Sequence, residues 1–341
     1  MKTILISDPT LRDGNHAVRH QLTLEQVAAY AAAANRAGVP IVEVGHGNGL
    51  GASSLQVGQS LLDDHDMLKA ARDNLSTSKL GIFMIPGFAT INKDLIPALD
   101  LGADVVRVAS HCTEADTTQR HIGFARERGK EVYGVLMMSH MAPGDVLLQE
   151  CRKMESYGAE GVILMDSAGA SLPSEVSDKV KNLVDHLAIA VGYHAHNNLG
   201  LAVANSIAAA QSGAVILDGT ACGFGAGAGN TPLEVLVAVL EKCGFSTGID
   251  LYKMLEASDL ARARLVENTP AINSASLVSG LAGVFSGFSK HVERVAGEYN
   301  VDFRDIFFEL GRRKAVAGQE DMIVEIAAKL AIKNSSLTAK Q

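Results

Sequence analysis

The sequence predicts an α/β protein, a (β/α)8 TIM barrel with a C-terminal helical appendage. Short apolar, β-branched runs alternate with longer amphipathic patterns, which is typical of βαβ units around a parallel sheet. Eight strand-like runs occur before residue 250, and we find no clear strand pattern after it. An open doubly wound sheet would show the same alternation, but eight consecutive parallel units favour a closed barrel.

The strand candidates follow one another at about the length of a βα unit, roughly 25–35 residues. They lie at Thr3–Ser7, Ile41–Gly45, Lys79–Ile85, Val105–Ala109, Glu131–Met137, Gly161–Met165, Ala190–His194 and Ala214–Asp218. Amphipathic helices are predicted in the intervals, and examples are Leu24–Arg36, Glu114–Arg128, Asp145–Tyr157, Leu199–Gln211 and Pro232–Lys242. We therefore expect residues 1–249 to form the barrel domain.

The chain changes character after Thr247. Helical patterns then follow one another without strands, at Asp250–Glu267, Val301–Lys314 and Asp321–Ala331. We expect residues 250–341 to form a helical C-terminal domain that packs on the barrel, with a frayed polar end.

Composition argues against several classes of protein. Hydrophobic residues make up 47% of the 341 residues, which is enough for a large core and excludes a wholly disordered chain. A net charge of -8 without a Lys/Arg run argues against a nucleic-acid partner. No uncharged apolar stretch reaches roughly 18 residues, so no membrane span is expected. Charged residues directly after the first apolar run do not fit a signal peptide, and the four cysteines form no CxxC pair, so we expect a reducing cytoplasm.

Reactive side chains collect where the predicted strands end. In barrels of this kind, the chemistry lies at the C-terminal ends of the strands. Seven of the eleven histidines lie at or near that face, with His121 the least certain member of the set: His16, His46, His111, His121, His140, His194 and His196. Scattered surface histidines would not be expected to gather in this way, so the face is a candidate active site.

His194 and His196 are the most informative pair in this set. Two residues apart on a strand end, their side chains point to the same side, here the barrel interior. Asp13 is the natural third ligand because strands one, seven and eight are close around the ring. Two imidazoles and a carboxylate suit a divalent metal with open positions for substrate oxygens. The alternative is a hydrogen-bonded pair of histidines in the barrel core.

Arg12 and His16 lie on the same loop as the candidate carboxylate. The guanidinium of Arg12 could hold a bound carboxylate or a developing enolate, or it could form a salt bridge with Glu43 or Asp166. His16 titrates near neutral pH, so it is either a general base or an ordinary loop histidine. The glycine-rich loop 223–230 lacks the lysine of a P-loop, which favours tight turns over a phosphate cradle.

Several motifs together resemble the DRE-TIM metallolyases, the superfamily that includes HMG-CoA lyase, isopropylmalate synthase and 4-hydroxy-2-oxovalerate aldolase. The shared motifs are Thr10–Gly14, Val42–Gly47, His194–Leu199 and Gly225–Asn230. Further runs narrow the resemblance to the 4-hydroxy-2-oxovalerate aldolases: Arg12–Gln21, His111–Asp116, Leu136–Met141 and Gly318–Ile323. The likeness extends over nearly the whole chain, including the helical appendage.

The resemblance implies a class II pyruvate aldolase, which cleaves a 4-hydroxy-2-oxoacid to pyruvate and an aldehyde or forms it from them. It implies a divalent cation, usually manganese with magnesium or cobalt as alternatives, held by Asp13, His194 and His196. By the same resemblance, His16 takes the proton of the C4 hydroxyl, and Arg12 stabilises the pyruvate enolate. The substrate-binding residues that it implies are Arg12, Ser167, His194 and Phe285.

Two positions depart from the family pattern. Phe285 stands where the family has a tyrosine with a role near the C4 oxygen, and Ala317 precedes Gly318 where the family has Gly-Gly. Relatives pass the aldehyde to an acylating acetaldehyde dehydrogenase through a channel near that pair. The departures weigh against the standard substrate and against this partner, but not against the reaction type. We also expect an oligomer.

The sequence also allows two other functions. Other branches of the superfamily are Claisen-type synthases or lyases that use acyl-CoA, but we see no basic cluster at the barrel mouth for the CoA phosphates. The third candidate is a non-catalytic barrel subunit, which a missing metal ligand would indicate.

Overall fold

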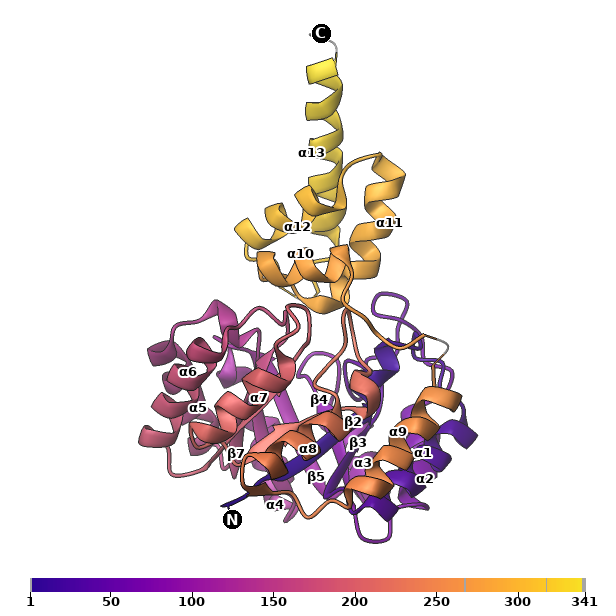
Figure 1. Cartoon of the computed structure of the whole chain (residues 1–341), viewed down its shortest axis with the longest axis vertical. Helices are drawn as coiled ribbons and strands as arrows, with labels where there is room; N and C mark the ends of the chain where they lie inside the picture. Colours follow the sequence, from indigo (N-terminus) through magenta and orange to yellow (C-terminus); the bar gives the residue numbers. More distant parts are fainter. Residues whose placement is uncertain (1, 267, 317, 339–341) are drawn as a thin grey trace.

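The computed structural model of this chain describes residues 2–266, 268–316 and 318–338. Eight parallel strands form a closed barrel in sequence order, and the last strand pairs with the first. The strands are β2 (Leu5–Leu11), β3 (Ile41–Val44), β4 (Lys79–Met84), β5 (Val105–His111), β6 (Glu131–Met137), β7 (Gly161–Asp166), β8 (Ala190–Ala195) and β9 (Ile216–Asp218). The predicted barrel is therefore confirmed (Figure 1).

Helices alternate with the strands and form the outer layer of the barrel. They are α1 (Leu24–Ala37), α2 (Asp64–Arg72), α3 (Ile96–Asp100), α4 (Gln119–Glu127), α5 (Gly144–Ser156), α6 (Pro173–His186), α7 (Ala202–Gln211) and α8 (Leu233–Lys242). Short helical turns precede several of them: η1 (Asp13–His16), η2 (Ile91–Leu95), η3 (Ala115–Thr118), η4 (Ser139–Met141) and η5 (Ala221–Gly223). A separate two-stranded sheet pairs β1 (Lys2–Thr3) with β10 (Phe245–Ser246).

Local sequence signals explain where the first of these helices begins and ends. The Thr23 side chain accepts a hydrogen bond from the Gln26 amide, and the Gln26 side chain accepts one from the Thr23 amide, which forms a capping box. The helix ends at Gly38, whose φ of +78° lies in the left-handed region that favours glycine.

The first barrel strand runs to Leu11, whereas the sequence predicts that it ends at Ser7. Proline and aspartate in the next residues favour a turn. In the structure, the pairing of β2 with β3 shifts register between Asp8 and Leu11, and such a bulge tolerates proline. The buried Asp8 carboxylate accepts hydrogen bonds from the Thr10 amide (2.9 Å) and from the Tyr30 hydroxyl (2.6 Å). The strand therefore continues to the barrel mouth and ends beside the predicted site.

The barrel interior has an apolar lower layer and a charged layer above it. Near the N-terminal ends of the strands, the apolar layer contains Ile41, Val105, Tyr133, Ile163 and Ile216. Two residues further along three of these strands lie Glu43, Arg107 and Asp218, and all three are buried. Because alternate residues of a strand point to the same face, the charged layer also lies inside the barrel.

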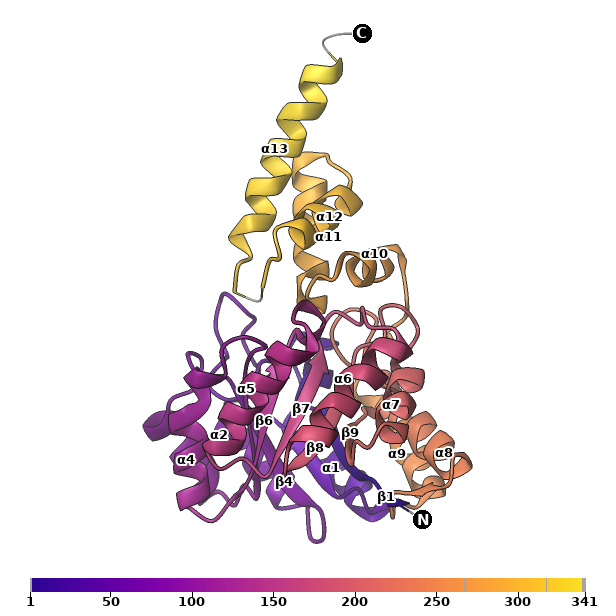
Figure 2. The same cartoon turned by 90° about the vertical axis from the view of Figure 1, so that its left-hand side faces the viewer.

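In the described part of the chain, five helices follow the barrel: α9 (Leu251–Arg264), α10 (Ser274–Ala282), α11 (Ser289–Tyr299), α12 (Phe303–Arg312) and α13 (Asp321–Thr338), with the short turn η6 (Ser286–Phe288) before α11. The sequence predicts counterparts of α9, α12 and α13 but not of α10 or α11. The serine and glycine content of α10 lowers its helix propensity, so this segment is helical because of tertiary packing. Figures 1 and 2 show α10–α13 above one end of the barrel, with α13 projecting away from it.

The packing of α9 bears on the division into domains, which the sequence places at residue 250. Met254, Ala257 and Ala261 of α9 belong to the hydrophobic cluster of the barrel, where the helix lies against α1 and α8. The helices α10–α13 share a separate cluster that contains Val292 and Phe307. We therefore propose that the C-terminal domain begins after α9. Within the described residues, every helix is too short or too polar to span a bilayer.

Candidate active site at the mouth of the barrel

Three residues that the sequence predicts as metal ligands lie together at the barrel mouth. Asp13, His194 and His196 are buried, and each offers one ligand atom within 4.8 Å of the others. Asp13 begins η1, separated from the end of β2 by one residue, and His194 lies near the end of β8, with His196 just beyond it. Strand order and period-two geometry are sufficient to explain why residues so far apart in the sequence converge here.

The ring nitrogens of this cluster suit a cation. Nδ1 of His194 lies 2.8 Å from Oδ2 of Asp218, so the imidazole donates its proton there. Nε2 of His194 and Nδ1 of His196 are then buried without a hydrogen-bond partner among the described residues. Buried polar atoms are rarely left unpaired unless they bind an ion, a water or a ligand. One carboxylate with two imidazoles therefore fits a divalent metal.

The Asp13 carboxylate is held from two sides. Nη1 of Arg12 donates to its Oδ2 at 2.6 Å, and Nδ2 of Asn230 donates to its Oδ1 at 2.9 Å. Burial alone would raise the pKa of Asp13, but the positive charge of Arg12 and the nearby histidines outweigh it and hold the pKa well below its usual range. The carboxylate is therefore ionised at neutral pH, as a metal ligand must be.

The glycine-rich loop packs against this carboxylate. A Cβ at Gly225 would lie 2.8 Å from Oδ1 of Asp13, and a Cβ at Gly229 would overlap the Gly223 carbonyl. Gly229 also has a φ of +88°. The glycines thus allow tight turns and close approach to Asp13, which agrees with the interpretation that the sequence favours.

Arg12 forms the salt bridge to Glu43 that the sequence offers as an alternative, and it still has one free nitrogen. Nε donates to Oε1 of Glu43 at 2.6 Å, while Nη1 donates to Asp13 and to the Gly47 carbonyl, 3.1 Å away. The guanidinium lies over the Phe83 ring, 4.3 Å from its centroid. Nη2 is buried without a hydrogen-bond partner in the described residues, so it can donate to a ligand oxygen.

His16 lies at the mouth beside two further histidines. Its ring packs edge-on against the His20 ring, with the two centroids 4.9 Å apart, and the His20 ring stacks on the His46 ring with a centroid distance of 3.7 Å. A side chain at position 47 would overlap the His16 ring, which explains Gly47. Burial is the main cause that lowers the pKa of His16 to about 4. The imidazole is therefore neutral at pH 7 and can accept a proton.

Ser167 and Phe285 lie where the barrel meets the C-terminal helices. Oγ of Ser167 accepts a hydrogen bond from the Met138 amide at 3.0 Å, and its carbonyl accepts one from the Ser286 amide at 3.1 Å. Phe285 directly precedes Ser286, and its ring packs edge-on against Phe288 at 5.7 Å. The described contacts thus tie the segment that carries Phe285 to the end of β7. Ala317 lies outside the described residues.

Comparison with known proteins identifies the family. A family model described as HMGL-like matches residues 3–261, and a model described as a DmpG-like communication domain matches residues 270–332. The chain belongs to the HMGL-like family. The first match ends within α9, and the second begins between α9 and α10.

Curated relatives of this HMGL-like chain match it from end to end. A 4-hydroxy-2-oxovalerate aldolase of Pectobacterium atrosepticum is 61% identical over 99% of this chain and 99% of the relative. Another protein of that name, from Spirochaeta aurantia, is 62% identical over 96% of each chain. The resemblance that the sequence motifs indicate is therefore confirmed at full length.

Solved structures with lower identity share the HMGL-like fold. The carboxyl transferase domain of Rhizobium etli pyruvate carboxylase, with oxamate and biotin, has a TM-score of 0.82 at 15% identity and covers 98% of this chain and 61% of that chain. The HMG-CoA lyase of Bacillus subtilis has a TM-score of 0.68 at 19% identity, with 81% and 97% covered. At these identities the likeness is one of fold.

Three polar residues that are not among the predicted site residues organise the site of this HMGL-like barrel: Arg107, Asp218 and Asn230. Arg107 is a charge inside the otherwise apolar run Val105–Ala109, and an arginine within a strand expected to be buried is rare enough to serve as a signal. Asp218 ends the last barrel strand, β9, so the strand-end rule applied to His194 would also have found it.

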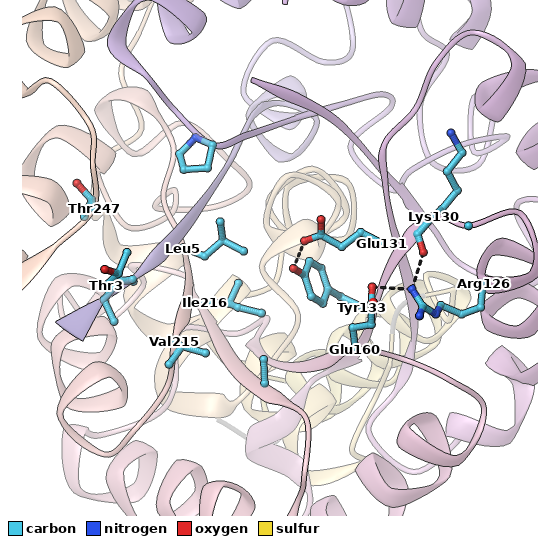
Figure 3. Close-up of a pocket in the computed structure, with 14 residues that line it drawn as sticks. Thr3, Leu5, Arg126, Lys130, Glu131, Tyr133, Glu160, Val215, Ile216 and Thr247 are labelled. Carbon is cyan, nitrogen blue, oxygen red and sulfur yellow. Dashed lines mark hydrogen bonds and ion pairs between the residues drawn. The ribbon is translucent and has the colours of Figure 1, made fainter. Parts of the chain in front are cut away.

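A cavity of about 590 Å³ lies at the opposite end of this HMGL-like barrel, where the strands begin. Figure 3 shows Leu5, Val215 and Ile216 on its apolar side. Two of its charged side chains are paired with each other, since Arg126 contacts Glu160 at 2.7 Å. The predicted site residues lie at the other end, so this cavity is not the candidate active site.

Proposed function

We propose that this chain is a divalent-metal-dependent aldolase that cleaves 4-hydroxy-2-oxovalerate, or a close 4-hydroxy-2-oxoacid, to pyruvate and a short aldehyde, or forms it from them. The observation that carries the proposal is the convergence of Asp13, His194 and His196 beside the unpaired Nη2 of Arg12. Full-length relatives named 4-hydroxy-2-oxovalerate aldolase support the substrate class.

We propose that Asp13, His194 and His196 hold the metal, with Mn²⁺ as the first candidate and Mg²⁺ or Co²⁺ as alternatives. When bound, the ion supplies Lewis acidity to the 2-oxo group of the substrate. Burial is the main cause that lowers the pKa of His196 to about 4, and Arg12 holds the pKa of Asp13 well below its usual range. A neutral imidazole at His196 and an ionised carboxylate at Asp13 are the protonation states that metal binding requires.

The remaining steps use side chains of this chain. The neutral ring of His16 accepts the proton of the C4 hydroxyl as the C3–C4 bond breaks, and the bonding electrons pass to the pyruvyl half. Nη2 of Arg12 donates a charge-assisted hydrogen bond to the oxygen on which the enolate charge develops. Because Glu43 and Asp13 already hold the other nitrogens of Arg12, this donor needs little reorganisation when the charge appears.

We propose that Ser167 and Phe285 complete the substrate site. The Ser167 oxygen accepts from a backbone amide, so its hydroxyl proton is free to donate to the substrate carboxylate. Phe285 supplies an apolar wall without the hydroxyl that a tyrosine would offer to the C4 oxygen.

Phe285→Tyr is expected to change the preference between the two C4 enantiomers of the substrate, because it adds a hydrogen-bond donor on one side of the C4 oxygen. The measurement compares kcat/KM for each enantiomer in wild type and variant. A matched control is Phe308→Tyr, on the exposed part of α12, which should leave the ratio unchanged. The same enantiomer ratio in Phe285→Tyr and wild type would remove Phe285 from the substrate site.

The proposed reaction is tested by pyruvate release from 4-hydroxy-2-oxovalerate, measured after chelation and after addition of Mn²⁺. We expect no turnover after chelation and full recovery with Mn²⁺. Release of free CoA thiol from acyl-CoA would instead support a Claisen-type enzyme. A metal-bound protein inactive on both substrates would support a non-catalytic subunit.

A dehydrogenase partner that accepts the aldehyde is a further proposal, supported by the match to a DmpG-like communication domain. The Phe285 and Ala317 departures weigh against the standard partner. An oligomeric state and a cytoplasmic location stay predictions.

A further inference from the structure

A series of alternating buried charges runs beneath the proposed metal site. Oε2 of Glu43 lies 3.2 Å from Nη1 of Arg107, and the Arg107 guanidinium binds Asp218 through two hydrogen bonds of 2.8 Å. Glu43 continues on one side to Arg12, and Asp218 continues on the other side to His194. Both ends of the series therefore reach the proposed site.

Arg107 occupies the middle of this series and is 1% exposed. It lies on β5, and its ion pairs among the described residues are with Glu43 and Asp218 rather than with the proposed ligands. Glu43 and Asp218 are buried carboxylates whose other side-chain partners are Arg12 and His194, and burying a negative charge in a low-dielectric interior is costly unless it is well paired. One planar guanidinium compensates both and also fixes their orientation.

Each carboxylate fixes one functional atom of the site. Asp218 accepts the Nδ1 proton of His194, which leaves Nε2 with a free lone pair. Glu43 accepts from Nε of Arg12, which holds that guanidinium with Nη2 free for a ligand. Orienting partners of this kind are often worth a factor of about 10–100 in metal affinity or activity.

We propose that Arg107 is a positioning residue that sets the metal-binding nitrogen of His194 and the enolate-binding nitrogen of Arg12 together, through Asp218 and Glu43. The inference rests on the proposed function, since it assigns a role toward the metal and the enolate. It goes beyond that function because Arg107 touches neither group and acts through two carboxylates.

The test is a titration of Arg107→Lys with Mn²⁺ alone, followed by the electron paramagnetic resonance signal of free Mn²⁺. Lysine keeps the positive charge but lacks the planar fork, so it cannot hold Asp218 with two hydrogen bonds and Glu43 with a third. We expect the Mn²⁺ Kd to rise about 10–100-fold. We also expect kcat to fall at saturating Mn²⁺, because Glu43 would then hold the Arg12 guanidinium less precisely.

Two single variants separate the effect on the metal-binding nitrogen of His194 from the effect on the enolate-binding nitrogen of Arg12. Asp218→Asn should mainly raise the Mn²⁺ Kd, and Glu43→Gln should mainly lower kcat at saturating Mn²⁺. Arg72→Lys is the matched control, because Arg72 pairs with Asp104 at 2.8 Å outside the site and should leave both quantities unchanged. Circular dichroism and the Tm establish that each variant is folded.

A wild-type Kd and a wild-type kcat in Arg107→Lys would overturn this inference but leave the proposed function standing. A wild-type protein that binds no Mn²⁺ would overturn the proposed metal site and this inference with it. If Arg107→Lys does not fold, the double variant Asp218→Asn/Glu43→Gln decides. Coupling through Arg107 predicts that its loss of kcat/KM differs from the product of the two single losses, and strict additivity would contradict the proposal.

Discussion

His194→Ala is expected to abolish measurable Mn²⁺ binding and to lower turnover by about 10³-fold or more. The substitution removes one of the two proposed imidazole ligands and the ring that donates to Asp218. A lost Lewis acid is worth several kcal/mol of transition-state stabilisation, and each 1.4 kcal/mol is about tenfold in rate. Asp13→Asn should have the same effect with almost no change in volume, because it removes the only anionic ligand of the proposed set.

The measurement pairs Mn²⁺ titration with pyruvate release for each variant. His186→Ala is the control, because His186 is an exposed histidine at the end of α6. It should bind Mn²⁺ and turn over like the wild type. Full turnover by His194→Ala or Asp13→Asn after chelation would mean that the ligand assignment is wrong.

Arg12→Lys is expected to lower kcat by about 10²–10³-fold at saturating Mn²⁺, the loss typical of one missing donor to a developing oxyanion. A single ammonium group cannot satisfy Glu43, Asp13 and the Gly47 carbonyl and still present a free N–H to the enolate. The charge is kept, so the variant avoids the stability loss of removing a buried cation from between the Glu43 and Asp13 carboxylates.

Exchange of the methyl protons of pyruvate with deuterated water isolates this effect, because it requires the enolate but no aldehyde. Nuclear magnetic resonance should show slower exchange in Arg12→Lys, in proportion to the loss of kcat. The same Arg72→Lys variant serves as the control. If exchange and kcat both stay within about threefold of the wild type, which is under 1 kcal/mol, Arg12 does not stabilise the enolate.

Much of the fold follows from patterns in the sequence. Eight alternating units predict the closed barrel, since each unit buries an apolar strand against an amphipathic helix. The extension of β2 to Leu11 depends on a bulge and on the partners of Asp8, which no local pattern reveals. No local pattern reveals helix α10 either, because its serine and glycine residues are helical through packing rather than through propensity.

The candidate site likewise has features that the sequence predicts and features that depend on tertiary contacts. The proximity of Asp13, His194 and His196 could be predicted because strand ends of a barrel meet at one face and alternate residues share a side. The contacts of Arg107 and Asn230 could not. Those contacts depend on the register of strands across the barrel interior and on the path of a glycine-rich loop, which only the three-dimensional structure specifies.

Anomalous diffraction at the manganese edge, from crystals of the protein grown with Mn²⁺, tests the central claim most directly. We expect a single strong peak at the barrel mouth, within bonding distance of an Asp13 carboxylate oxygen, Nε2 of His194 and a ring nitrogen of His196. A peak bonded elsewhere, or a barrel mouth without one under conditions in which the enzyme is active, would contradict the account.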